Sequence, residues 1–117
     1  MPYSGAVDQQ RLGALRGHFL LDRLDRWLRD SPLIVAHCAG SKALWGEPLW
    51  DREQLREPDR VALTVNGVIL LLDIAPSRHR RRVVARWCRE RSRTTAWRFH
   101  YRAVPIVPLL GGRGVIA

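Results

Sequence analysis

The sequence predicts one α/β domain with a four-stranded mixed sheet and two packed helices; an α+β arrangement of the same elements is the alternative. Three observations support this fold class. The chain has 117 residues, the size of a single domain. Apolar residues make up 46% of it, enough for a core and too many for a wholly disordered chain. The expected elements run helix, strand, strand, strand, helix, strand, an order typical of a sheet with helices packed on it.

Residues 8–30 carry apolar side chains at helical spacing, so we expect a helix whose apolar stripe lies in the core. Asp8 is the expected N-cap, and Ser31-Pro32 ends the helix. Residues 33–39 form a short apolar run, which predicts a strand covered on both faces. The stripe consists of Leu12, Leu15, Phe19, Leu20, Leu24, Trp27 and Leu28.

A connector is expected over residues 40–59, with a helical turn near residues 51–55. It contains two tryptophans, Trp45 and Trp50. Each either covers the core or belongs to an exposed contact patch. The sequence does not choose between these roles.

Residues 60–74 contain two β-rich runs on either side of Asn66-Gly67, the strongest short signal for a hairpin. The second run, residues 68–72, is apolar on both faces, which predicts the central strand of the sheet. Pro76-Ser77 then opens a second helix over residues 78–93.

Residues 97–104 alternate in character, as a strand with two different faces does. Trp97, Phe99 and Tyr101 are expected in the core because the opposite face carries the charge. Pro105 and Pro108 predict that residues 105–117 form an extended tail, so the folded core spans about residues 8–104.

The net charge of +9 is concentrated in one part of the chain. Residues 1–77 carry nine basic and ten acidic side chains, whereas residues 78–102 carry ten arginines and a single acid, Glu90. Arginine's planar fork matches phosphate geometry well. The clustering therefore predicts a phosphate-binding surface on the second helix and the last strand. Its candidate residues are Arg78, Arg80, Arg81, Arg82, Arg86, Arg89, Arg93, Arg98 and Arg102.

The start of the second helix strengthens this prediction. Cations there oppose the helix dipole, at a cost of about 0.3–1 kcal/mol each when exposed. A sequence selected for stability alone would place acids in this turn. Free N–H groups at a helix start, together with arginines, favour phosphate. A solvated charged face and a docking surface for an acidic protein remain the alternatives.

Two aspartates lie where a known family has its metal ligands. Pro58-Asp59 precedes the second strand, and Asp73 ends the third, in the sequence Asp73-Ile74-Ala75. With the order of elements, this arrangement resembles the PD-(D/E)xK nuclease-like core over about residues 8–104. The resemblance implies that Asp59 and Asp73 are candidate catalytic residues that bind a divalent metal such as Mg²⁺.

One departure from the family's motif bears directly on activity. Ala75 stands where the family has a lysine that assists the attacking water. Alanine can neither orient a water nor stabilise charge on a cleaved phosphate. Arg78 or His79 is the candidate replacement for the missing cation. The resemblance is therefore to a degenerate, non-cleaving relative.

The sequence thus predicts a basic nucleic-acid-binding protein, for DNA or RNA, that is non-catalytic or weakly catalytic and needs no cofactor unless it is a nuclease. Two alternatives are a Mg²⁺-dependent nuclease with an altered site, and a small mobile-element or phage protein that docks on an acidic protein. The longest uncharged stretch has 12 residues, against about 18 for a membrane span, and residues 1–8 lack signal-peptide features. We therefore expect a cytoplasmic protein with no membrane partner.

Overall fold

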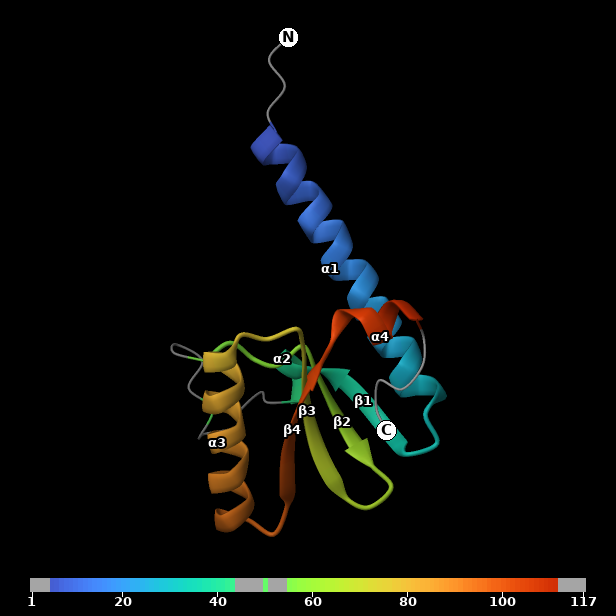
Figure 1. The fold of residues 1–117 in the computed structure, drawn as a ribbon. Coiled ribbons are helices and arrows are strands. Elements are labelled where there is room, and N and C mark those ends of the chain that lie inside the picture. Colours follow the sequence, from blue (N-terminus) through green and yellow to red (C-terminus); the bar gives the residue numbers. More distant parts are fainter. Residues whose placement is uncertain (1–4, 44–49, 51–54, 112–117) are drawn as a thin grey trace.

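The computed structural model describes residues 5–43, 50 and 55–111, which form one mixed four-stranded sheet with helices on both faces (Figure 1). The strand order is β1-β2-β3-β4; β1–β2 and β2–β3 are antiparallel, and β3–β4 is parallel. This confirms the predicted fold class and adds two short helices to it. The elements are α1 Gly5–Asp30, β1 Ile34–Ala39, α2 Gly40–Ala43, β2 Arg60–Thr64, β3 Val68–Ile74, α3 Arg78–Thr94, β4 Arg98–Val104 and α4 Ile106–Gly111.

Helix α1 covers one face of the sheet with only its second half. Leu24 and Leu28 are fully buried there, whereas Leu15 and Phe19 are exposed because the first half of α1 projects beyond the sheet (Figure 1). The prediction that the whole stripe lies in the core is therefore wrong for these two residues. Asp8 is not the N-cap either, since the helix already begins at Gly5.

The β2–β3 hairpin is confirmed, with a connection one residue longer than the Asn-Gly pair alone. Gly67 has φ 77°, which favours glycine, and its N–H donates to Thr64 O (3.0 Å). The N–H of Val68 donates to Thr64 Oγ1 (3.0 Å). These bonds and the positive φ are those of a three-residue turn that ends in a left-handed glycine.

Strand β3 is central, as predicted, and separates two apolar cores. Leu70 and Leu72 face α1 and α4, while Leu71 faces α3. Trp50 is buried in the second core with 3% of its surface exposed, and its ring packs edge-on against Trp87 at 4.9 Å. Trp50 is thus a core residue; Trp45 and the expected turn at 51–55 lie largely outside the described residues.

Strand β1 is an edge strand, so the prediction that both its faces are covered is wrong. Val35 is 62% exposed, and Leu33 just before the strand is 47% exposed. A short apolar run predicts a strand, but whether both faces of the strand are buried depends on how far helices from other parts of the sequence extend over it. Here the buried side chains of α1 share a core with residues of β2 and β3, and of β1 only Ile34 packs against that core.

Strand β4 follows α3 and lies parallel to β3, so α3 is the crossover connection between them. Phe99 and Tyr101 pack into the core beneath α3, as predicted. Trp97 is 58% exposed because it lies one residue before the strand begins, which corrects its expected core position.

The predicted extended tail is also wrong over its first part. Residues 106–111 form α4, whose Leu109 is fully buried, and Arg23 of α1 donates to the carbonyl oxygen of Leu110 (2.8 Å). Pro105 immediately precedes this helix and Pro108 lies in its first turn, and both are compatible with it because backbone N–H groups there have no intrahelical partner.

None of the helices in the described parts of the chain combines the length and apolar character that crossing a membrane requires.

Candidate functional site

Asp59 and Asp73 lie side by side at one end of the sheet. The β2–β3 pairing places Asp59, just before β2, opposite the end of β3. The N–H of Asp59 donates to Asp73 Oδ1 (3.0 Å), and the N–H of Ile74 donates to Asp59 Oδ2 (2.8 Å). Each carboxylate is therefore oriented by the backbone of the neighbouring strand.

Asp73 is fully buried and accepts hydrogen bonds from two further elements. Its Oδ2 accepts from Arg80 Nε (2.8 Å) and from the Tyr101 hydroxyl (2.7 Å). Arg80 reaches it from the first turn of α3, where Ser77 is the N-cap and its Oγ accepts from the N–H of Arg80 (3.1 Å). This carboxylate thus joins β3, α3 and β4.

Arg56 brings a second guanidinium to the pair. Its Nη1 donates to Asp59 Oδ1 (3.1 Å), and its Nη2 lies 3.9 Å from Asp73 Oδ1. A third arginine, Arg60, makes a two-pronged ion pair with Asp25 (2.6 and 2.9 Å), which ties α1 to β2. The hydrogen bond from Arg60 lowers the pKa of Asp25 against the opposing effect of burial.

The ionisation of these groups follows from their neighbours. Burial by itself would raise the pKa of Asp73, but the hydrogen bonds from Arg80 and Tyr101 outweigh it and the pKa lies below its usual value. Burial and the hydrogen bond to Asp73 raise the pKa of Tyr101. Asp73 is therefore a carboxylate and Tyr101 a neutral donor at neutral pH.

This arrangement does not fit a Mg²⁺ ion held by Asp59 and Asp73. The Asp73 oxygens already accept three hydrogen bonds, one of them from the Arg80 guanidinium, whose positive charge repels a second cation. Within the described residues, no group of three His, Cys, Asp or Glu side chains gathers where it could hold a metal ion. The network is built to join four elements of the fold.

Ala75, two residues after Asp73, has φ 46°, and it alone among the described non-glycine residues has a positive φ. In a continuing strand, residue 75 would share a face with residue 73. Here β3 ends at Ile74, and the N–H of Ala75 donates to Val104 O (2.8 Å). The backbone therefore turns away directly after Ile74, and Ala75 does not continue the strand on the face of Asp73. Arg78 and His79 are exposed, and Arg80 instead supplies the cation.

Replacing Ala75 with glycine should stabilise the protein by about 0.5–1 kcal/mol. A left-handed conformation costs an L-residue about 1–2 kcal/mol, and glycine removes this cost. Glycine also has more conformational freedom in the unfolded chain, which cancels part of the gain. Urea unfolding measures the change. Ala85→Gly, inside α3, is the control and should lose about 1 kcal/mol. Equal losses in both variants would contradict the assigned strain.

The basic candidates on α3 form one outward face, with one exception. At 3.6 residues per turn, five of the arginines fall within about 80° of the helix circumference, opposite the buried Val84 and Trp87. The first turn of α3 contains no acidic residue. Arg80 is the exception, because it points inward and only 12% of its side chain is exposed. We call the exposed set the arginine face: Arg78, Arg82, Arg86, Arg89 and Arg93, with Arg81 beside them.

No ion pair joins the arginine face to any other described residue. Its charges therefore stay uncompensated by the described part of the chain. The helix beneath them is fixed by Val84, Trp87 and Cys88 in the second core. Burial raises the pKa of the Cys88 thiol to about 12, so this cysteine is an unreactive packing residue.

The charged row of β4 does not extend the arginine face. Arg98, His100 and Arg102 are opposite Val68, Leu70 and Leu72 in the parallel pairing, so they share the sheet face that α1 covers. Helix α3 packs on the other face. The expectation of one continuous basic surface is therefore corrected to two, on opposite faces of the sheet. The β4 row borders a groove of about 450 Å³.

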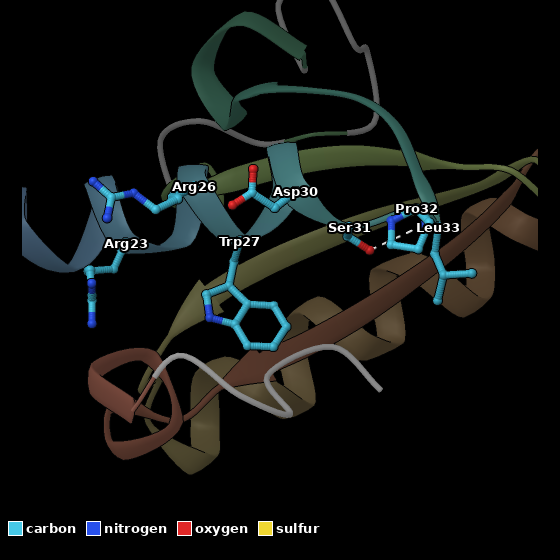
Figure 2. A pocket seen from close by; sticks show the side chains of 7 residues that line it. All are labelled: Arg23, Arg26, Trp27, Asp30, Ser31, Pro32 and Leu33. Atoms are coloured by element: carbon cyan, nitrogen blue, oxygen red, sulfur yellow. Dashed lines mark hydrogen bonds between the residues drawn. The ribbon is translucent and has the colours of Figure 1, made fainter.

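A separate pocket of about 360 Å³ lies where α1 ends and the chain turns toward β1 (Figure 2). Figure 2 shows the Trp27 ring projecting from the last turns of α1, with Arg23 and Arg26 on one side and the turn at Ser31 on the other. Neither Asp59, Asp73 nor any residue of the arginine face lines it.

Sequence reasoning missed two members of the carboxylate network. Arg56 lies in the expected connector, and Tyr101 was expected only as a core residue. Arg80 was expected on the basic surface. The spacing gives no signal for these roles, because Tyr101 is 28 residues from Asp73 along the chain.

Comparison with protein-family models, with curated proteins and with solved structures gives no match for this chain.

Proposed function

We propose that the protein binds nucleic acid without cleaving it, and that the arginine face of α3 grips the phosphate backbone. The observation that supports this most is the run of six exposed arginines on one side of a well-anchored helix, with no acidic partner among the described residues. From Arg78 to Arg93 the face is about 22 Å long at 1.5 Å per residue.

The Asp73–Arg80 ion pair supports this function by fixing the position of α3. It anchors the first turn of α3 to β3, and Tyr101 adds a bond from β4. The arginines that follow are thereby held on a rigid element, which lowers the entropy lost on binding. Contacts to phosphate oxygens carry no sequence information, so a face that binds through the backbone is expected to show little sequence preference.

Fluorescence anisotropy of labelled duplex DNA, single-stranded DNA and RNA, at several salt concentrations, tests this proposal. Six phosphate contacts predict a log–log salt slope near −5 for a duplex. Reversing Arg82 and Arg86 to glutamate leaves four contacts and should reduce the slope to about −3.6, with at least about a tenfold loss of affinity. The preferred ligand identifies the class of nucleic acid.

The matched control is Arg98→Glu with Arg102→Glu, which makes the same change in net charge on the opposite face of the sheet. It should bind nearly as tightly as the wild type. Equal losses in both double variants would mean that net charge alone governs binding. Absence of binding at the lowest salt would overturn the proposal and direct the search to acidic proteins.

A metal-dependent nuclease is the second candidate, because Asp59 and Asp73 do meet at the strand ends. The Arg80 guanidinium and the turn at Ala75 oppose it. Incubating bound substrate with Mg²⁺ or Mn²⁺ distinguishes the two. Intact substrate supports the non-cleaving function, and cleavage that is lost in Asp59→Asn would establish the nuclease.

A further inference from the structure

The two edge strands of the sheet, β1 and β4, differ in how well they are protected from pairing with another strand. The β4 edge carries the charged side chains Arg98, His100 and Arg102. It is also blocked at Phe99, whose N–H donates to Ser92 Oγ (2.8 Å) and whose carbonyl oxygen lies 3.2 Å from the same hydroxyl. Charges and side-chain caps are the devices by which edge strands avoid pairing with another strand.

The β1 edge carries no such charges or side-chain caps, but its register with β2 shifts once, between Ile34 and Ala36. Its sequence, Ile-Val-Ala-His-Cys-Ala, contains no Lys, Arg, Asp or Glu, and the ring of His37 lies near Asp25 of α1 (Nε2 to Oδ1, 3.7 Å). Val35 is 62% exposed on this strand. β1 pairs only with β2 in the sheet that the described residues form. Beyond that shift, residues 36–39 pair regularly with β2, and among the described residues no strand pairs with their outer side, so another strand could add there.

We propose that β1 pairs antiparallel with β1 of a second copy of this chain, joining the two sheets into one of eight strands. The charge distribution selects this partner. The excess charge lies in residues 78–102, on α3 and β4, whereas residues 1–77 carry a net charge of −1. β4 is three strand spacings, about 14 Å, from β1. Two copies therefore meet through nearly neutral sides, and an acidic partner would be drawn to α3 instead.

Antiparallel pairing of identical strands is self-complementary, with a twofold axis perpendicular to the joined sheet. The two α3 helices then lie on the same face. Counting strand spacings of about 4.8 Å, they are about 30 Å apart. One turn of duplex DNA spans about 34–36 Å. The pairing would thus set two arginine faces against one side of a duplex; this step alone rests on the proposed function.

Sedimentation equilibrium of the full chain over a range of micromolar concentrations tests the pairing directly. The wild type should be dimeric, and Val35→Lys should be monomeric because it places a charge on the joined strands. Val65→Lys is the matched control: Val65 is 56% exposed in the β2–β3 turn, away from the edge, and the variant should remain dimeric. A monomeric wild type, or a Val35→Lys dimer, would overturn the proposal.

Hydrogen exchange of the wild type needs no variant and covers the case in which Val35→Lys fails to fold. The β1 amides should become more protected as the concentration rises, while β4 amides should not change. Equal protection of β1 at all concentrations would contradict the pairing. Failure here leaves the nucleic-acid proposal intact, since a monomer still carries one arginine face; loss of nucleic-acid binding likewise leaves the dimer untouched.

Discussion

Replacing Asp73 with asparagine should destabilise the protein by about 3–5 kcal/mol, because it leaves the Arg80 guanidinium buried without its counter-ion. Asp73 is fully buried, and only 12% of the Arg80 side chain is exposed. The variant also weakens the bond from Tyr101, whose hydroxyl lies 2.7 Å from the carboxylate. Urea unfolding at neutral pH measures the loss.

Two further variants separate the buried charge from simple loss of contacts. Tyr101→Phe removes one hydrogen bond and should cost about 1 kcal/mol. Asp73→Asn combined with Arg80→Met removes both charges and should recover part of the stability lost in Asp73→Asn. Strict additivity of the two substitutions would show that the ion pair is not the source of the effect.

The same residue predicts how stability depends on pH. The pKa of Asp73 in the folded protein lies below its usual value, so the unfolded chain binds its proton more readily. The contribution of ionised Asp73 to the free energy of unfolding is complete above the unfolded-state pKa of about 3.9. It is lost as the pH falls through the lower folded-state pKa. As the pH is lowered through this range, the free energy of unfolding should therefore decrease less for Asp73→Asn than for the wild type.

Replacing Gly40 with alanine should cost about 2–3 kcal/mol, since overpacking a filled site typically costs 1–3 kcal/mol and here the obstacle is rigid. Gly40 is buried at the start of α2, and a Cβ there would overlap the carbonyl oxygen of Pro58. Because Pro58 precedes Asp59, relief of the clash would also displace the carboxylate pair. Urea unfolding measures the loss.

Gly17→Ala is the control for this substitution. Gly17 lies inside α1, and nothing lies within 4 Å of a Cβ built there. Alanine has the higher helix propensity, so this variant should gain about 1 kcal/mol. A neutral Gly40→Ala would mean that the backbone at Pro58 yields easily.

The sequence by itself determined the hairpin, the central strand, β4 and α3, because the signals for each of these elements lie within a few residues of each other. Asn66-Gly67 marks the hairpin, and the alternation over 97–104 marks β4 and its two faces. The apolar run at 68–72 identifies the central strand because only burial on both sides favours such a run. Helix α3 and its arginines follow from helical spacing alone.

Only the tertiary structure decided what lies next to what. Strand β1 is an edge because no further described strand pairs with it, and Arg80 turns inward because Asp73 and Tyr101 lie beneath α3. The crossover from β3 to β4 puts α3 on one face and the Arg98–Arg102 row on the other, although both lie within 25 residues of each other. Such contacts depend on sums of weak interactions between distant segments, and no local spacing encodes them.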